Sequence, residues 1–405
     1  MSRGVYEGLR VVEFGQYISV PYAGELFANG GATVIKIEPI TGDVTRNSNN
    51  LGPKHGRLYV TQSRGKQGIP IALGTDAGRD LARELVLSAD IVITNMRPGL
   101  MRGLGLAYDQ LSSEKPGLIY GEISGYGPDS PNADLACVDS IAQAESGMML
   151  SVGGANGSKP IMGEAFLTDY MSGTLLAFAL AGALHVRNET GRGQHVSTTL
   201  MQASLALQHA SANVFYDYDP WKPEFVAKAE APGSTIERRM AERVSHRPQR
   251  PYNYDVYETA DGAISVGAVG AMAPKYAEIL GLVDTEAADI HEQTEIAMKG
   301  WATTELVQRF QEAGIPCGRV RFLEDMVLDP VSEDAGYVYR GEHPVAGPYL
   351  MPTAPVKFSD SSFEVGVSWP SLGEHTYQVL GDIGFDAKKI ATLVAEGVVL
   401  DDKVH

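Results

Sequence analysis

Short apolar runs alternate with helical segments over the first 125 residues, and this alternation limits the fold more than any other feature. The runs are apolar throughout rather than at every second position, as in strands that are covered on both faces. Residues 76–90, between two of the runs, carry apolar side chains at helical spacing. Strand, helix and strand at this spacing predict right-handed crossovers and an open, doubly wound parallel sheet. The predicted strands are 10–14, 33–38, 69–73, 90–94 and 118–124, and the helical stripe consists of Ala77, Leu81, Leu85 and Val86.

The length of 405 residues and a change of texture near residue 216 predict two domains. Proline and charged residues dominate after that point, as in a linker, and two predicted strands then join at Asp261-Gly262. We therefore expect an α/β protein with a doubly wound, Rossmann-like large domain and a small α+β domain. The expected parts are the N-terminal part of the large domain at 1–215, a linker at 216–250, the small domain at 251–325, and a linker with a C-terminal part returning to the large domain at 326–405.

The formal net charge of −17 argues against general binding to nucleic acid or to an anionic membrane, although local arginines could still bind an anionic small molecule. The two cysteines cannot form a disulfide framework, and neither they nor the nine histidines have metal-site spacing. The longest apolar stretch, from Gly173 to Leu184, is far shorter than the about 20 residues of a membrane span. The N-terminal residues contain no signal-peptide core. We therefore expect a cytoplasmic protein with no metal site.

The turn after the first predicted strand argues against a nicotinamide-dependent dehydrogenase. It reads FGQYISVPYAG rather than GxGxxG, and bulky Tyr17, Ile18 and Val20 would block the close backbone approach that a pyrophosphate needs. Glu38 ends the second strand where a ribose-binding acid would lie, but without the glycines we interpret it as a surface residue.

Two other places carry residues with possible chemistry, and each also has a purely structural interpretation. Asp169 stands where an apolar helix should begin. Its negative charge could simply stabilise the helix by interacting with the helix dipole. Alternatively, Asp169 could be a partly desolvated carboxylate that attacks an activated acyl group. Arg97 and Arg102 follow a strand among glycines, where they could bind phosphate oxygens or be ordinary surface arginines.

Taken together, the motifs resemble those of the family III CoA-transferases, the group that includes formyl-CoA transferase and the carnitine CoA-transferases. The resemblance covers nearly the whole chain, and the order and spacing of the motifs are more specific than any one of them. The motifs are GLRVVEFGQYISVPYAGELFANGGATVIKIEPITGD, NMRPG, ISGYGPDSP, VDSIAQAESGMM, LTDYMSG, ETGRGQHVSTTL, GIPCGRV, the step Asp329-Pro330 and LGEHTYQVL.

The resemblance implies that Asp169 is the nucleophile of a D-x-x-x-G segment that Gly173 completes. Asp169 would form a mixed anhydride with the acyl group of a donor acyl-CoA and then an aspartyl-CoA thioester, from which CoA passes to a carboxylic acid. No ATP, metal or permanently bound cofactor is implied, because CoA thioesters are themselves the substrates. A dry pocket would protect the intermediates from water, and backbone amides near Asp169 could stabilise oxyanions.

The resemblance also assigns contacts with CoA and with the thioester. Asp139 falls where formyl-CoA transferase has an active-site acid, although it could equally cap the helix that follows it. Ile18 and Ser19 match a segment near the thioester. The expected CoA-binding residues are Ile71, Ala72, Leu73, Gly74, Asn95, Met96, Arg97, Arg102, Ala136, Cys137 and Val138.

Two departures from formyl-CoA transferase favour a larger or less polar acyl group than formyl or oxalyl. Ile18 replaces a glutamine, and the stretch before Tyr252, ERVSHRPQRP, lacks a run of glycines that closes over the site. Two alternatives remain. One is a 2-methylacyl-CoA racemase of the same superfamily, although Val138 stands where racemases have their histidine base. The other is a non-catalytic CoA-binding subunit of a hetero-oligomer.

Family members form interlocked dimers, so the resemblance implies a homodimer or a heteromer with a related subunit. The expected reaction is a reversible transfer of CoA from a donor such as succinyl-CoA to a carboxylic acid. Acceptors consistent with the resemblance are a dicarboxylate, an aryl-substituted succinate or an aryl-propanoate. No nucleic acid or membrane partner is expected.

Overall fold

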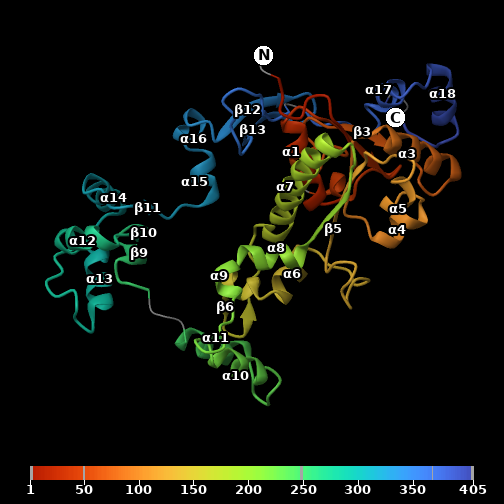
Figure 1. The fold of residues 1–405 in the computed structure, drawn as a ribbon. Coiled ribbons are helices and arrows are strands. Elements are labelled where there is room, and N and C mark those ends of the chain that lie inside the picture. The colour runs from red at the N-terminus through yellow and green to blue at the C-terminus, as the bar shows by residue number, and fades with distance from the viewer. Residues whose placement is uncertain (1–2, 49–50, 247–249, 367, 403–405) are drawn as a thin grey trace. The chain divides into compact units, whose positions relative to one another are not determined.

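The computed structural model describes residues 3–48, 51–246, 250–366 and 368–402 (Figure 1). The chain divides into two compact units, which are described separately. Unit 1 comprises residues 1–222, 235–237 and 339–405, and unit 2 comprises 223–234 and 238–338.

Unit 1 contains a six-stranded sheet in which every neighbouring pair is parallel. Along the sheet the order is β3, β2, β1, β4, β5, β8, which is the strand order of dinucleotide-binding folds. The prediction of a parallel α/β sheet is therefore confirmed. The strands are β1 (Arg10–Phe14), β2 (Thr33–Glu38), β3 (Gln67–Pro70), β4 (Ile91–Thr94), β5 (Ile119–Ser124) and β8 (His195–Thr199).

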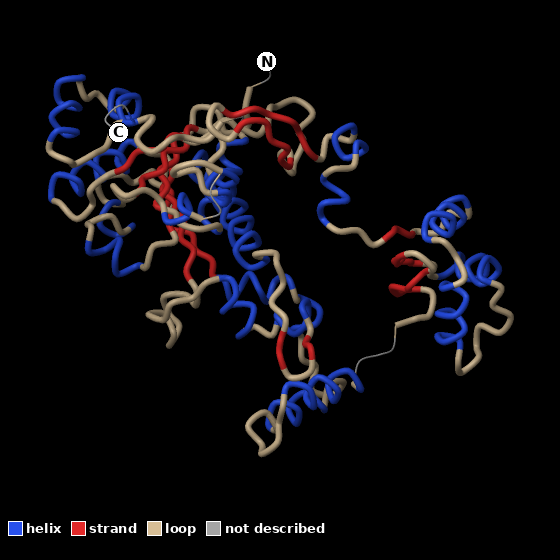
Figure 2. Tube along the Cα trace, turned by 180° about the vertical axis from the view of Figure 1, so that it is seen from behind, coloured by secondary structure: helices blue, strands red, loops and turns tan. Residues whose placement is uncertain are grey.

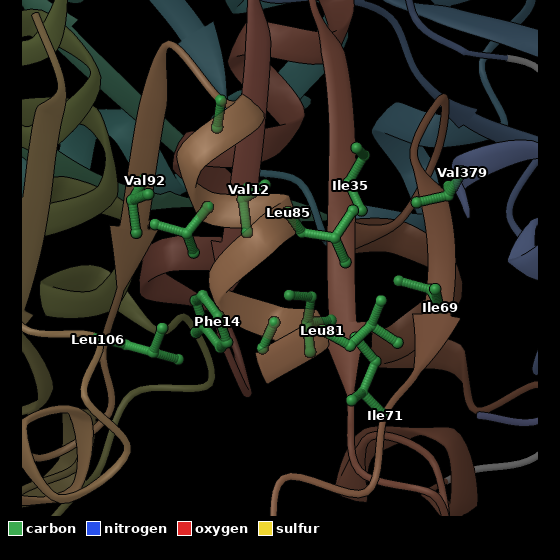
Figure 3. Packing of buried hydrophobic residues seen from close by; sticks show 14 of the residues in the cluster. Val12, Phe14, Ile35, Ile69, Ile71, Leu81, Leu85, Val92, Leu106 and Val379 are labelled. Carbon is green, nitrogen blue, oxygen red and sulfur yellow. The ribbon is translucent and has the colours of Figure 1, made fainter. Parts of the chain in front are cut away.

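In the central strands, the side chains of successive residues pack into two different hydrophobic cores, one on each face of the sheet, so the sheet is covered on both faces. Val12 and Phe14 of β1 pack on one face with Leu81 and Leu85 of α3 (Asp76–Ser88), as Figure 3 shows. The same core receives α17 (Thr376–Asp382) and α18 (Ala387–Ala395) from the C-terminal part of the chain. Figure 2 shows the red strands of unit 1 with blue helices on both sides.

The other face is covered by α1 (Ser19–Asn29) and α7 (Leu167–Thr190). Leu176, Leu180 and Leu184 of α7 pack against the sheet, and Gly191 ends the helix in the left-handed conformation that favours glycine. Within the described residues, α7 is the one helix long and apolar enough to cross a membrane, and it is also a core helix that packs against the sheet.

Shorter elements complete unit 1. They are the 3-10 helix Val44–Asn47, α2 (Arg57–Gln62), α4 (Pro98–Gly103), α5 (Tyr108–Leu111), α6 (Asp139–Glu145), the π-helix Met149–Gly153, β6 (Ala155–Asn156), β7 (Lys159–Pro160), α8 (Leu200–Leu207), α9 (His209–Ala212), β12 (Val338–His343) and β13 (Gly347–Pro352).

Unit 2 contains an antiparallel sheet in the order β11, β10, β9, whose buried face packs Tyr257 and Ile264 against Tyr276 and Phe310. Thr259 pairs with Gly262, so the hairpin loop is Ala260-Asp261, one residue before the predicted turn. The predicted linker 216–250 contains two helices, α10 and α11. The elements are α10 (Trp221–Ala227), α11 (Ile236–Ser245), β9 (Tyr254–Thr259), β10 (Gly262–Gly267), a 3-10 helix (Gly270–Met272), α12 (Ala273–Leu280), α13 (Ile290–Lys299), α14 (Thr303–Glu312), β11 (Cys317–Arg319), α15 (Leu323–Val327) and α16 (Pro330–Asp334).

The interpretation of Glu38 as a surface residue is wrong. Its side chain is 1% exposed and accepts hydrogen bonds from Nε and Nη2 of Arg46, each at 2.7 Å, and from the Tyr59 hydroxyl at 3.0 Å. Its other contact is the backbone N–H of Asp43, at 2.9 Å. Glu38 therefore holds the loop after β2 and has no free oxygen for a ribose.

A second buried carboxylate lies between two lysines beneath α1. Glu13 of β1 is 3.1 Å from Nζ of Lys36 and 2.7 Å from Nζ of Lys66, and all three side chains are buried. Lys36 also pairs with Asp43 at 2.9 Å. A β-carbon on Gly24 of α1 would stand 2.1 Å from Glu13 Oε2, so this glycine allows α1 to lie directly over the ion pairs.

Candidate active site

Asp169 lies in the first turn of α7 with little access to water. The residue is 9% exposed, and among the residues that the structure describes none donates a hydrogen bond to its carboxylate. Burial, and after it the charge of Asp139, raises the pKa of Asp169 to about 7. A buried carboxylate without donors is more basic and more nucleophilic than one in water, as a covalent catalyst requires.

Asp139 lies beside Asp169 because it caps the helix that carries it. Oδ2 of Asp139 accepts hydrogen bonds from the Thr168 backbone N–H at 2.8 Å, the Thr168 hydroxyl at 2.7 Å and the Asp169 N–H at 3.2 Å. Oδ1 accepts one from Nε2 of Gln143. Asp139 is therefore a helix cap, as its structural interpretation predicts, but it caps α7 rather than α6, the helix that it begins.

These hydrogen bonds correct one expectation about the backbone near the nucleophile. The N–H groups of Thr168 and Asp169 bind Asp139, and the N–H of Tyr170 donates to the Phe166 carbonyl at 3.1 Å. The amides around Asp169 are therefore occupied and not free to bind a developing oxyanion.

Gly173, the glycine of the D-x-x-x-G segment, allows α1 and α7 to cross at close range. A β-carbon at this position would stand 2.5 Å from the carbonyl oxygen of Ser19 and 3.2 Å from the ring of Tyr22. The close crossing brings the start of α1 against α7 one turn after Asp169.

The loops after β1 and β4 meet at the point where the connections of the sheet diverge, which is where open α/β sheets bind ligands. Oδ1 of Asn95 accepts a hydrogen bond from the Gln16 N–H at 3.0 Å, and its Nδ2 donates to the Gln16 carbonyl at 2.8 Å. Nδ2 also donates to the Ser19 hydroxyl at 3.1 Å. Tyr17, between these residues, has a φ of 61°, an uncommon conformation for a non-glycine residue.

Among the other residues predicted to contact CoA or the thioester, some are accessible to solvent and others are buried. Ile18 is 1% exposed, so its side chain belongs to the core rather than to a surface that a substrate could reach. Ile71 is also buried, and the Ala72 N–H donates to the Val398 carbonyl at 2.8 Å. Leu73 is half-buried, and Gly74 is exposed.

The predicted phosphate contacts also differ in their surroundings. Arg97 is exposed at the start of α4, and within the described chain no hydrogen bond or ion pair engages its guanidinium. Arg102 pairs with Asp109 through bonds of 2.9 and 3.1 Å, so its charge is already used. Met96 packs against the core on the α3 face.

Of the loop before α6, Ala136 and Val138 are exposed, and Cys137 lies against Gly125, where a β-carbon would stand 2.3 Å from that of Cys137. Burial is the main cause that raises the pKa of the Cys137 thiol, and the Asp169 charge adds to it. The structure thus brings Cys137 and Asp139 to Asp169.

Sequence reasoning missed three residues of this region: Thr168, Gln143 and Gln16. Gln143 follows Asp139 by four residues, which is helical spacing, and this signal could have linked the two. No comparable signal marks Thr168 or Gln16, because both act largely through backbone groups.

Several exposed apolar side chains lie in α6 and in the chain segments that precede α6 and α7. We call them the apolar rim, and they are Leu135, Val138, Ile141, Ile161, Met162 and Phe166. Val138 directly precedes Asp139, and Phe166 is the N-cap residue of α7. Of the stretch 242–251, which precedes Tyr252 and lacks a run of glycines, residues 247–249 lie outside the described residues.

Solved structures with the same fold include Rv3272 from Mycobacterium tuberculosis, with a TM-score of 0.77, 24% identity and coverage of 93% of this chain and 99% of that one. A CAIB/BAIF family protein from Brucella suis has a TM-score of 0.75, 24% identity and coverage of 95% and 100%.

Sequence relatives have named activities. A cinnamoyl-CoA:phenyllactate CoA-transferase from Clostridium sporogenes is 27% identical over 97% of this chain and 96% of its own. A succinyl-CoA:glutarate CoA-transferase from Homo sapiens is 27% identical over 98% and 91%. A formyl-CoA:oxalate CoA-transferase from Rhodopseudomonas palustris is 28% identical over 97% of each chain.

The family model of CoA-transferase family III matches residues 6–376. This match contains the loops after β1 and β4, Asp139 and the whole of α7. The resemblance found in the sequence is confirmed, and the chain belongs to the family III CoA-transferases.

Proposed function

We propose that this enzyme transfers CoA reversibly from an acyl-CoA to a carboxylic acid, with Asp169 as the covalent carrier. The observation that carries the proposal is the state of the Asp169 carboxylate: buried, without hydrogen-bond donors among the described residues, and with its pKa raised to about 7. Such a group gains more from covalent bonding to an acyl carbon than a solvated carboxylate does.

The reaction proceeds through two kinds of covalent intermediate. An oxygen of Asp169 attacks the thioester carbonyl, the C–S bond breaks, and CoA thiolate leaves an acyl-aspartyl anhydride. The thiolate then attacks the aspartyl carbonyl and expels the donor carboxylate, which leaves an aspartyl-CoA thioester. The acceptor carboxylate repeats these steps in reverse order, so one activated carboxyl group is kept throughout and no net proton is needed.

CoA is proposed to lie at the divergence point of the sheet. Asn95 joins the two loops there, and the exposed guanidinium of Arg97 follows at the start of α4. An exposed arginine next to the strand ends suits the phosphates of CoA. Arg102 is the weaker candidate, because Asp109 already neutralises it.

The acceptor is proposed to be a carboxylic acid with an apolar body, such as an aryl-propanoate or an aryl-substituted succinate, and the donor a CoA ester such as succinyl-CoA. The apolar rim supports this, since exposed apolar side chains next to a site bind apolar groups. The name of the Clostridium sporogenes relative, which acts on cinnamoyl-CoA and phenyllactate, points to the same class.

A dimer, of two copies or with a related subunit, is also part of the proposal, and so is a cytoplasmic location. Phe178 of α7 is 79% exposed, and two segments each carry several exposed apolar side chains. These segments contain Val214, Phe215, Tyr216 and Tyr218 in unit 1, and Phe322, Leu323, Leu328 and Val331 in unit 2. Exposed apolar surface of this extent is typical of association faces.

The test is intact-protein mass spectrometry after incubation with a panel of acyl-CoAs. Hydroxylamine or borohydride then traps the adduct, and peptide mapping locates it. We expect an adduct on Asp169 in the unmodified protein and in the control Asp382→Asn, which changes an exposed aspartate of α17, but none in Asp169→Asn. Transfer activity that survives in Asp169→Asn would overturn the proposal. Exchange of the α-proton of a 2-methylacyl-CoA without an acceptor acid would indicate a racemase instead.

A further inference from the structure

We infer that Asp139 is a positioning residue that fixes the first turn of α7 and, by holding a second negative charge beside Asp169, favours the covalent forms of that residue over the free carboxylate. The inference rests on the proposed function of Asp169 and adds a physical device that controls it.

The first part of the role follows from the missing cap of α7. The first N–H groups of a helix have no partner within it, and Phe166 at the N-cap position has no side chain that could accept from them. Asp139 is buried and accepts from two of these N–H groups and from the Thr168 hydroxyl. The turn that carries Asp169 is therefore held from another helix.

Gln143 holds Asp139 in turn. Its Nε2 donates to Oδ1 of Asp139 and to the carbonyl of Ala165, at 3.3 Å in the latter case, so it joins α6 to the chain just before α7. Four donors thus face the Asp139 carboxylate. The Asp169 carboxylate has no such donors among the described residues.

The second part of the role follows from this contrast. Two carboxylates held together in a site of low polarity repel each other, and only Asp139 is compensated by hydrogen bonds. When Asp169 becomes an anhydride or a thioester its charge disappears, and the repulsion disappears with it. Asp139 therefore destabilises the free enzyme relative to each intermediate, and it also makes Asp169 more nucleophilic at neutral pH.

The other titratable groups near Asp169 do not compensate its charge. The pKa of the Cys137 thiol and of the Tyr170 hydroxyl are raised, chiefly by burial, so both are neutral near pH 7. On α1, Tyr22 is likewise neutral because burial raises its pKa, and Glu25 is paired with Arg64 at 2.6 Å. Tyr126 and Glu145 act on Cys137 from the neighbouring loop and from α6.

The test separates charge from hydrogen bonding. Asp139→Asn keeps an oxygen that can cap α7 and removes the charge, since Gln143 can turn its amide to present an oxygen. Thr168→Val keeps the charge and removes one hydrogen bond. The rate and final extent of adduct formation on Asp169 are measured for both variants and the unmodified protein from pH 5.5 to 9, with an acyl-CoA that labels the unmodified protein.

In Asp139→Asn we expect the acidic limb of the rate profile to move to lower pH by about one unit and the adduct fraction at pH 8 to fall several-fold. In Thr168→Val the limb should stay in place. An unchanged limb and adduct fraction in Asp139→Asn would overturn the inference, because the charge would then have no effect on Asp169. An equal shift of the limb in Thr168→Val would also overturn it, because the hydrogen bonds rather than the charge would then control Asp169.

A second measurement keeps the inference separate from the proposed function. Titration of the Asp169 carboxyl carbon by NMR in 13C-aspartate-labelled protein needs no reaction. We expect its midpoint to fall in Asp139→Asn, or in Asp139→Ser if the first variant does not fold. If the unmodified protein forms no adduct, the transferase mechanism fails. If the midpoint does not move, the role of Asp139 fails.

Discussion

The carbonyl oxygen of Ser19 lies 2.5 Å from the point at which a β-carbon on Gly173 would stand. The start of α1 and the second turn of α7 therefore approach each other too closely for a side chain at position 173, and Asp169 stands one turn away. The geometry of the nucleophile depends on the absence of a methyl group at this position.

Gly173→Ala should destabilise the protein, because the new methyl group meets backbone rather than a flexible side chain, and overpacking of this kind costs about 1–3 kcal/mol. Adduct formation at Asp169 should fall with it. Gly182→Ala, in the same helix but with open space around the new β-carbon, is the control and should stabilise by about 0.5–1 kcal/mol. Urea unfolding measures both, and equal effects would contradict the close crossing.

Asp169→Asn should make the protein more stable at alkaline pH. Burial raises the pKa of Asp169 from 3.8 to about 7, so the folded protein binds more protons than the unfolded chain between these values, and stability falls as pH rises through this window. Asparagine carries no such charge. The gain should be near zero below pH 4 and reach at most ~4 kcal/mol at pH 8. Urea unfolding at several pH values tests this, and a gain that does not grow with pH would refute it.

Glu13→Gln should destabilise the large unit strongly. The substitution leaves Lys66 buried without its carboxylate and Lys36 with Asp43 alone, and an uncompensated buried charge costs about 3–5 kcal/mol. The control is Asp109→Asn, which breaks the exposed pair with Arg102 and should change stability little. Denaturant midpoints of the two variants measure the difference. Similar losses of stability in both would contradict the expectation that the buried ion pairs of Glu13 matter more to stability than an exposed pair.

Asn95→Ala should raise the KM for acyl-CoA several-fold while the protein stays folded. The variant loses three hydrogen bonds that join the loops after β1 and β4, each of which contributes about 1 kcal/mol. Steady-state kinetics with a fixed acceptor acid measure the change. Asn132→Ala, on an exposed turn, serves as the control. An unchanged KM in Asn95→Ala would place CoA away from these loops.

The sheet could be predicted from the sequence wherever its strands are buried on both faces. The bounds of β1 and β2 are as predicted, because their apolar runs of five and six residues are too short to form a stable helix. β8 was not predicted, since HVSTT is polar and lies at the edge of the sheet, where only one neighbour supports it. In α3 the buried stripe contains Gly78 rather than Ala77, because Gly78 meets the carbonyl of Ala72 and has no room for a side chain.

The candidate site was predictable as far as motifs reach. The D-x-x-x-G pattern predicts Asp169 as the nucleophile, and the crossing of α7 with α1 is the physical reason for the glycine of the pattern. The role of Asp139 could not be predicted, because its partners are backbone N–H groups 29 and 30 residues later in the chain. Glu38 was misread for a similar reason, since Arg46 and Tyr59 surround it only once the chain has folded.

The return of the C-terminal part to the large unit has a consequence for synthesis of the chain. Ile71 forms a bridge with Val399, and Val379, Leu380 and Ile390 finish the core beside β3. On the ribosome, all six strands emerge long before these residues do. The apolar edge at β3 therefore stays uncovered until α17 and α18 have been synthesised, and during that time it can associate with neighbouring nascent chains. That edge is covered only after residues 376–399 have been synthesised.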